Sequence, residues 1–269
     1  MTKKQNKEYF MGHHPLDNWR LERKVDPKKF VLTFIDQYLE KETVALEIGC
    51  GPGTIAKYIG NHYHDVNLTV IDKSLEKIST THSNTMDLKK IKTVGGDIYK
   101  LPFKDNSYDF IFCRLLFQYL KNPQAAVNEM VRVCKKNGSI MVQDLDGQLL
   151  THFPEQKEFQ DQIEKVSKLI AKRQGFDPYI GRKLYSFFKK AGLEKIQVKI
   201  NEYHNIMGKI DEKNKILWNA KLELALPELR QALGCIIKAE QLKKDYMNYL
   251  MDENTCTFSL MMTVYGKKQ

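Results

Sequence analysis

Three glycines alternate along the segment Gly49-Cys50-Gly51-Pro52-Gly53, and the acidic Glu47 stands two residues ahead of them. Glycines at every second position leave backbone without Cβ atoms, so a ligand can lie against the chain. The apolar run 43–48 predicts a strand before this loop, and a helical pattern over 54–61 predicts a helix after it. A strand, a glycine-rich turn and a helix N-terminus together form a site for a ribose or a negatively charged group.

The spacing of these glycines separates two kinds of nucleotide cofactor. The dinucleotide fingerprint G-x-G-x-x-G would need a glycine at position 54, where the chain has Thr54. The observed form is instead E-x-G-x-G-x-G, which resembles the first motif of class I S-adenosylmethionine-dependent methyltransferases. A glycine-rich turn in an ordinary α/β protein is the alternative that this loop alone leaves open, and a dehydrogenase is the least favoured one.

Further charged residues stand where the next three expected strands end. Asp72 closes the β-branched run 67–72, about 20 residues beyond the glycines, where a carboxylate can accept both ribose hydroxyls. Asp97 follows a third expected strand at 91–95, and Arg114 follows a fourth. Because ligands lie at the carboxyl ends of parallel strands, we expect these side chains to meet beside the glycine loop.

The resemblance assigns roles to these positions. It implies that S-adenosyl-L-methionine, with S-adenosyl-L-homocysteine as product, is held by Glu47, Gly49, Gly51, Gly53, Asp72, Lys73, Asp97, Ile98 and Arg114. Glu47 would lie near the amino group of the cofactor and Asp72 would hold its ribose. Asp97 and Ile98 would define the adenine pocket, with Lys73 beside it. Arg114 would lie near the methionine part, or else pair with a helix carboxylate.

The rest of the chain continues the same pattern. The segment 101–113 resembles the family's "LPF.d.sfD.v" segment, a loop running into a buried fourth strand, and Asn122-Pro123 predicts the start of a helix. A fifth strand is expected at 139–144, a helix at 180–193, a sixth strand at 195–203 and a final antiparallel strand at 258–265, at the sheet edge. Strands alternating with helices imply a parallel sheet.

We therefore expect an α/β fold, a Rossmann-like, seven-stranded, mostly parallel sheet with helices on both faces, an antiparallel last strand and a helical lid insertion. The resemblance covers about residues 30–200 and the final strand, and it is to the ubiquinone/menaquinone-biosynthesis-like small-molecule group, methyltransferase type 11. The expected division is an N-terminal cap segment at 1–29, a methyltransferase core at 30–204 and 257–269, and a helical insertion at 205–256 over the active site. The cap would either cover the cofactor or form a packed helix with solvated charges.

The acceptor side carries weaker signals. The candidate bases are His13, His14 and His204, with Tyr119 and Asp144 as polar groups near the strand ends, and Tyr119 is a further catalytic candidate. Many members of the resembled family carry a histidine after the fourth strand, where this chain has Phe117-Gln118, and an amide cannot act as a base near neutral pH. Methyl transfer needs alignment and water exclusion more than a catalytic group, so no catalytic residue is assigned.

Composition limits the partners. The formal charge is +10, from 36 lysines and only 7 arginines against 33 acids. Arginine makes the bidentate phosphate and base contacts, so this excess favours a solvated lysine surface over specific nucleic-acid reading. Five widely separated cysteines predict reduced thiols, with no disulfide or metal site, and no leader or membrane span is visible, which predicts a cytoplasmic protein.

The leading interpretation is thus transfer of a methyl group by in-line displacement to an O, N or C atom of a small-molecule acceptor. An RNA or protein methyltransferase and a non-catalytic, cofactor-binding regulatory protein are the alternatives. The identity of the acceptor and the oligomeric state, with a homodimer among the options, do not follow from the residues.

Overall fold

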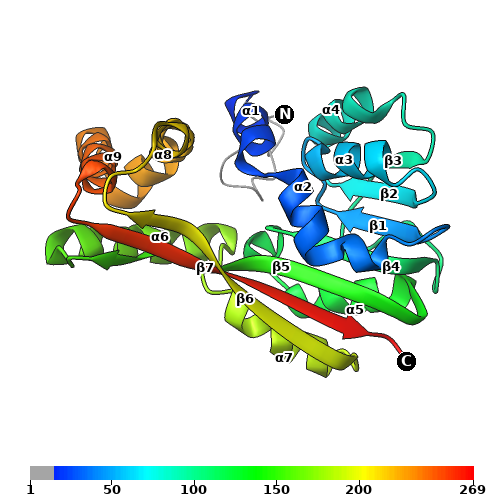
Figure 1. Ribbon diagram of the computed structural model, residues 1–269. Helices are drawn as coiled ribbons and strands as arrows, with labels where there is room; N and C mark the ends of the chain where they lie inside the picture. Colours follow the sequence, from blue (N-terminus) through cyan, green and yellow to red (C-terminus); the bar gives the residue numbers. More distant parts are fainter. Residues whose placement is uncertain (1–14) are drawn as a thin grey trace, which may run out of the picture.

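A computed structural model describes residues 15–269, and seven strands in it form a single sheet (Figure 1). The strands are β1 Val44–Ile48, β2 Asn67–Asp72, β3 Ile91–Gly95, β4 Tyr108–Arg114, β5 Cys134–Phe153, β6 Glu194–Met207 and β7 Cys256–Lys267. Their order is β3-β2-β1-β4-β5-β7-β6, with β1 to β5 pairing in parallel and β7 antiparallel to both of its neighbours. The expected α/β fold with an antiparallel last strand is confirmed.

The expected position of the last strand was wrong. β7 is not at the edge of the sheet but lies between β5 and β6, and β6 forms the edge. The physical reason is visible in the burial of the two strands, because β7 includes the buried Val264 and Tyr265, whereas the side chains of β6 are mostly exposed. An inner strand hydrogen-bonds on both sides and needs apolar side chains, while an edge strand tolerates charge.

Helices cover both faces of the sheet. The α-helices are α1 Pro15–Lys24, α2 Pro27–Phe30, α3 Thr54–His62, α4 Leu75–Thr85, α5 Pro123–Val133, α6 Lys157–Gln174, α7 Leu184–Lys190, α8 Glu212–Leu233 and α9 Ile236–Met251. Shorter helical turns are η1 Val31–Ile35, η2 Asp36–Tyr38, η3 Phe117–Tyr119 and η4 Gly181–Lys183. Asn122 caps α5 as expected, because its side chain accepts a hydrogen bond from the Ala125 amide at 3.1 Å.

The alternation of side chains along the central strands produces two apolar cores. Leu46 of β1 and Ile111 of β4 pack with α5 and α7 on one face. Ala45 and Phe112, their neighbours in the sequence, pack with α3 and the segment 30–39 on the other face. This is the period of two that a strand with both faces buried imposes.

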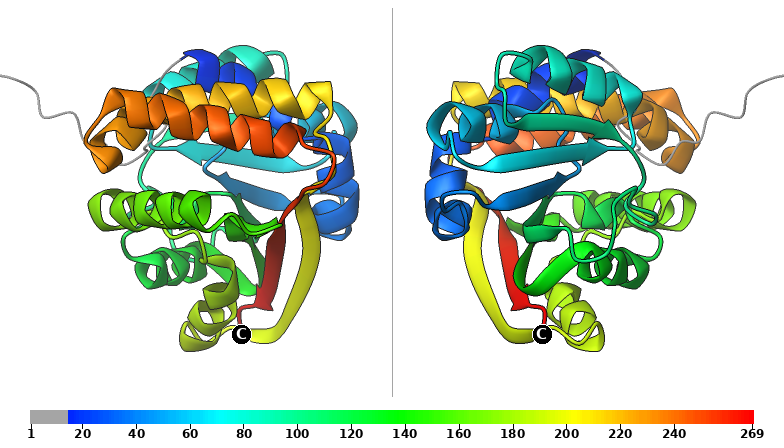
Figure 2. Two further views of the ribbon diagram at one scale, coloured as in Figure 1. Left: turned by 90° about the vertical axis from the view of Figure 1, so that its left-hand side faces the viewer. Right: turned by 90° about the vertical axis from the view of Figure 1, so that its right-hand side faces the viewer.

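A third apolar cluster lies at one end of the sheet, where α6, α8 and α9 pack together (Figures 1 and 2). β5 and β6 run farther than the sequence indicated, to Phe153 and Met207, and reach this cluster. The helices of the expected insertion begin at Glu212, and α6, which the sequence analysis did not identify, joins them. None of the described helices is long and apolar enough to cross a membrane.

Helix α1 lies between the α8–α9 pair and the α3–α4 pair (Figure 1). It packs against α8, and the fully buried Asp17 ties it to α4. Asp17 accepts from Arg20 at 2.6 Å and from Lys77 at 3.1 Å. The described part of the cap segment is therefore a packed helix, joined to both the sheet domain and the C-terminal helices.

Candidate functional site

A cavity of about 450 Å³ opens at the carboxyl ends of β1, β2 and β4. The sheet register explains why the expected residues meet there, because Ile48 pairs with both Ile71 and Cys113, and Asp72 pairs with Gly95. The residues that follow these pairs therefore lie close together at the carboxyl edge of the sheet. The cavity is lined by Glu47, Gly49, Gly51, Asp72, Lys73, Asp97, Ile98 and Arg114, eight of the expected cofactor residues, and by Tyr119.

The glycine loop is held open by specific backbone contacts. Gly49, Gly51 and Gly53 have φ of +75°, +55° and +79°, the left-handed region that other residues rarely adopt. The Asp72 carboxylate accepts from the Gly51 amide at 3.1 Å, and the Thr81 hydroxyl donates to the Gly51 carbonyl at 2.7 Å. Gly53 does not line the cavity but lies behind the loop, where a Cβ would meet Cγ2 of Thr81 at 2.5 Å.

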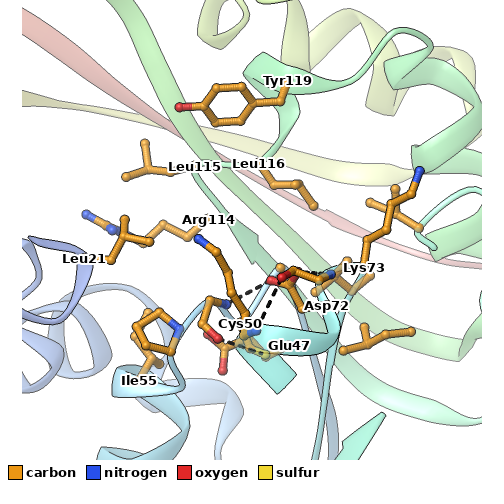
Figure 3. A pocket seen from close by; sticks show the side chains of 18 of the residues that line it. Leu21, Glu47, Cys50, Ile55, Asp72, Lys73, Arg114, Leu115, Leu116 and Tyr119 are labelled. Atoms are coloured by element: carbon orange, nitrogen blue, oxygen red, sulfur yellow. Dashed lines mark hydrogen bonds between the residues drawn. The ribbon is translucent and has the colours of Figure 1, made fainter. Parts of the chain in front are cut away.

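Two carboxylates at this end of the cavity have contrasting surroundings (Figure 3). Both oxygens of Asp72 are used, since they accept from the amides of Gly51 and Ser74 at 3.1 and 2.9 Å. Glu47 is only 4% exposed, and its Oε2 is buried with no hydrogen-bond partner among the described residues. Burial, with Asp72 adding to it and Arg114 opposing it, raises the pKa of Glu47 to about 8. Glu47 is thus a buried acceptor still in need of a donor.

The third carboxylate, Asp97, follows β3. Its side chain pairs with the Lys73 ammonium at 3.1 Å and accepts from the Tyr99 amide at 3.0 Å. The next residue, Ile98, is buried and offers an apolar surface to the same cavity. The expected arrangement of an acid followed by an apolar residue is present here.

Arg114 lies at the end of β4, as the sequence indicated. Its Nε donates to Oε1 of Gln143 at 3.0 Å, and its guanidinium lies 5.5 Å from the ring centre of Phe30. The alternative that Arg114 pairs with a helix carboxylate was wrong, because its side-chain partners are the Gln143 amide of β5 and the Tyr203 hydroxyl of β6. The charge of Arg114 therefore remains available to a bound anion.

The expected acceptor-side residues differ in whether they line the cavity. Tyr119 lines the cavity, across from Glu47 and Asp72 in Figure 3, and burial raises the pKa of its hydroxyl, which keeps it neutral. His204 does not line the cavity. It hydrogen-bonds to the Ser259 hydroxyl at 3.1 Å and packs against Trp218, and burial lowers its pKa well below the usual value. It is a half-buried histidine that serves the packing beside Trp218. His13 and His14 lie outside the described residues.

Asp144 also serves the fold rather than the cavity. It is fully buried, and it accepts from the amides of Gln118 and Leu145 at 3.2 and 2.8 Å. Burial raises the pKa of Asp144 to about 7, and these amide donors oppose that rise. Its contact with Gln118 fixes the turn that follows β4. The described residues that line the cavity include no histidine.

One part of the cavity was missed from the sequence. Arg20, Leu21 and Lys24 of α1 and Lys221 of α8 line it, and we call these four residues the helical wall. The sequence allowed the cap segment to cover the cofactor and placed the insertion over the active site. Lys24 and Lys221 themselves carried no signal, because nothing distinguishes them from the other lysines of a lysine-rich chain.

Comparison with known proteins relates the central part of the chain to a protein family. Residues 46–142, from β1 to β5, match a family model described as a methyltransferase domain. The chain contains a methyltransferase domain. This match confirms the resemblance carried by the glycine motif and the acids that follow it.

Curated proteins that are similar to this chain are named as methyltransferases. An uncharacterized methyltransferase of Schizosaccharomyces pombe is 29% identical over 160 residues, which cover 56% of this chain and 57% of that protein. Demethylmenaquinone methyltransferase of Staphylococcus aureus is 30% identical over 110 residues, or 39% of this chain and 44% of that protein. The chain thus spans about half the length of the curated relatives it matches.

Solved structures agree with the fold of this methyltransferase domain protein. Phosphoethanolamine N-methyltransferase 2 of Haemonchus contortus, solved in complex with S-adenosyl-L-methionine, matches with a TM-score of 0.54 and 15% identity, covering 86% of this chain and 50% of that one. At this identity the match supports the architecture alone.

Proposed function

We propose that this protein is an S-adenosylmethionine-dependent methyltransferase that transfers a methyl group by in-line displacement to an O, N or C atom of a small-molecule acceptor. The observation that carries the proposal is the position of Glu47, Asp72 and Asp97 around one cavity, at the ends of three parallel strands and beside the glycine loop. A glycine-rich turn of an ordinary α/β protein needs none of these acids. A dinucleotide site would leave Asp97 without a role.

The residues present fit the cofactor. Oε2 of Glu47 is buried without a donor, which an ammonium group such as the amino group of the cofactor supplies. Asp72 is oriented by two amide donors, so its carboxylate is preorganised for the hydroxyls of a ribose. Ile98 and the Lys73–Asp97 pair suit the apolar faces and the polar edge of an adenine. Arg114 offers positive charge for a carboxylate.

The bound cofactor would supply an electrophilic methyl group on a sulfonium. The protein's part is to align an acceptor with that group and to exclude water, which together account for several kcal/mol of a displacement barrier. The neutral hydroxyl of Tyr119 can donate to or accept from an acceptor, but burial keeps it from acting as a base near neutral pH. Alignment is therefore the main contribution of the described residues.

The helical wall favours a small acceptor over RNA or protein. Helices α1 and α8 pack against each other, and residues of both line the cavity. An acceptor must therefore fit, together with the cofactor, inside a space bounded by these helices. A macromolecule would need an open path for its backbone to the methyl group.

Calorimetric titration with S-adenosylhomocysteine and with NAD tests the cofactor assignment. We expect the homocysteine compound to bind, and Asp72→Asn to weaken it at least tenfold, because a charge-assisted hydrogen bond contributes about 1.5–3 kcal/mol. Asp87→Asn, at an exposed position after α4, is the matched control. Binding of NAD alone would overturn the proposal.

A second experiment addresses activity and acceptor class. Cell extract is incubated with methyl-labelled cofactor and the protein, and the label is then counted separately in small molecules, RNA and protein. Label in the small-molecule fraction that depends on Asp72 supports the proposal. Label in RNA or protein contradicts the acceptor class, and no transfer to any fraction supports the non-catalytic alternative.

A further inference from the structure

One group of residues that line the cavity carries more positive than negative charge. Arg20, Lys24 and Lys221 of the helical wall meet Arg114 there. Of these, Arg20 is paired with the buried Asp17. The other three make no ion pair to a carboxylate within the described part of the chain.

Lys24 and Arg114 are each stabilised in part by other groups. The Lys24 ammonium lies 5.3 Å from the ring centre of Tyr203 and feels the carboxylates of Asp144 and Asp17, while Arg114 donates to Gln143. An aromatic face and an amide ease the burial of a cation, but they do not neutralise it. The nearby carboxylates balance only part of the positive charge of this region.

Lys221 is the least compensated of these cations. Its Nζ is buried with no hydrogen-bond partner among the described residues, and it lies 4.3 Å from the ring centre of Trp218. Burial lowers the pKa of Lys221 well below its usual value, and the cations Lys24 and Arg20 lower it further. A buried ammonium without a counterion costs several kcal/mol. On a cavity, a bound anion would stabilise such a group in its charged form.

The cofactor alone does not satisfy this charge. It brings a single carboxylate, while its sulfonium and amino group are positive. One of the cations of α1 or β4 suffices for that carboxylate, and Lys221 comes from a different element, α8. A second anion in the cavity would neutralise Lys221 and offset the repulsion among Lys221, Lys24 and the sulfonium.

We propose that the methyl acceptor is an anion, a carboxylate or a phosphate monoester, and that Lys221 binds its charged group. This inference rests on the proposed function, since it deepens the assignment of the same site. Lys221 is an acceptor-binding residue on this account. The anion positions the acceptor against the helical wall and leaves its nucleophilic atom directed toward the cofactor.

The test uses three aromatic probes of similar size: benzoate, phenyl phosphate and the neutral benzamide. Each is titrated into the full chain at pH 7.5, with and without saturating S-adenosylhomocysteine. The signal is the fluorescence of Trp218, observed in a Trp19→Phe background that leaves Trp218 as the only tryptophan. Because the Lys221 ammonium lies over the Trp218 ring, a probe that binds Lys221 should change the fluorescence of this tryptophan.

We expect at least one anion to bind saturably and benzamide to bind at least tenfold more weakly. Lys221→Met should weaken the anion at least tenfold while changing the affinity for S-adenosylhomocysteine less than twofold. Lys213→Met, at an exposed position of the same helix, should behave as the unaltered chain does. Comparison of benzoate with phenyl phosphate decides between the two anion types.

Three results would overturn the inference: binding of benzamide as tight as that of the better-binding anion, an anion affinity unchanged by Lys221→Met, or no binding of either anion. Removal of a buried ammonium should leave the variant at least as resistant to heat as the unaltered chain, and Lys221→Gln serves as a second variant. Failure of S-adenosylhomocysteine to bind the unaltered chain refutes the proposed function instead. In that case, anion binding that depends on Lys221 would still be seen in the titration without S-adenosylhomocysteine.

Discussion

Replacing Glu47 by glutamine should change how the stability of the free protein depends on pH. Glu47 is buried, and its pKa is raised from 4.5 to about 8 in the folded chain. Between these values the folded protein binds a proton that the unfolded protein releases. Stability therefore falls as pH rises from about 4.5 and levels off above about 8. Glutamine has nearly the shape of the protonated acid and does not titrate.

The size of the effect follows from the same two values. Each pH unit between them corresponds to about 1.4 kcal/mol, so the full range amounts to ~5 kcal/mol, on the order of half the stability of a typical domain. From pH 5.5 to 7.5 the unaltered chain should lose roughly 2.7 kcal/mol relative to Glu47→Gln. For a chain of this size, that difference in free energy corresponds to a shift of roughly 5–10 °C in the midpoint of thermal unfolding.

The assay is urea unfolding of the ligand-free protein at a series of pH values, followed by circular dichroism. The difference between the two curves isolates Glu47, because Asp144, whose pKa is raised to about 7, titrates in both proteins. Glu240→Gln, at an exposed position of α9, is the matched control and should leave the curve unchanged. Parallel curves for the unaltered chain and Glu47→Gln would refute the reasoning.

Two further substitutions test how the site is supported. Gly53→Ala should lower the free energy of unfolding in urea by roughly 1–3 kcal/mol, because φ is +79° and the new Cβ would lie 2.5 Å from Cγ2 of Thr81. Adding Thr81→Ser, which removes this methyl group and keeps the hydroxyl, should restore part of the lost stability. No restoration would contradict the steric explanation. Asp17→Asn should lower the free energy of unfolding by about 3 kcal/mol, because it leaves the charges of Arg20 and Lys77 without their buried partner. The variant should also be cleaved in α1 by limited proteolysis. An unchanged cleavage pattern would show that this pairing does not hold α1 in place.

The glycine loop and the acids around it could be predicted because their signals are local. Glu47 and the glycines form one short motif, and Asp72 directly closes a β-branched run. Each residue therefore belongs to a strand end that the sequence itself marks, and the parallel pairing of those strands brings the ends to one level. The helix start at Asn122-Pro123 is a signal of the same local kind.

The place of β7 depends on pairing between distant segments, and the motif could not give it. A usable signal was nevertheless present, because the strand at 258–265 is almost wholly apolar, whereas β6 carries charged residues such as Lys195 and Lys199. Charge on one strand marks it as the edge. Helix α6 offered less, since its apolar residues, such as Val166 and Ile170, are buried in a cluster formed largely by the C-terminal helices. Its amphipathic pattern has no partner in the nearby sequence.

The same physical distinction separates the two halves of the cavity. The half with the glycine loop is built by consecutive strands, helices and turns, so each of its residues is positioned by neighbours in the sequence. The helical wall is built by α1 and α8, which come from opposite ends of the chain and meet only through tertiary packing. An unpaired lysine is informative only once its burial is known, and burial is set by that packing. On the proposed function, the cofactor site is therefore encoded in a motif, whereas acceptor recognition would depend on the contact between α1 and α8, where a change of one lysine would alter the acceptor without disturbing the loop.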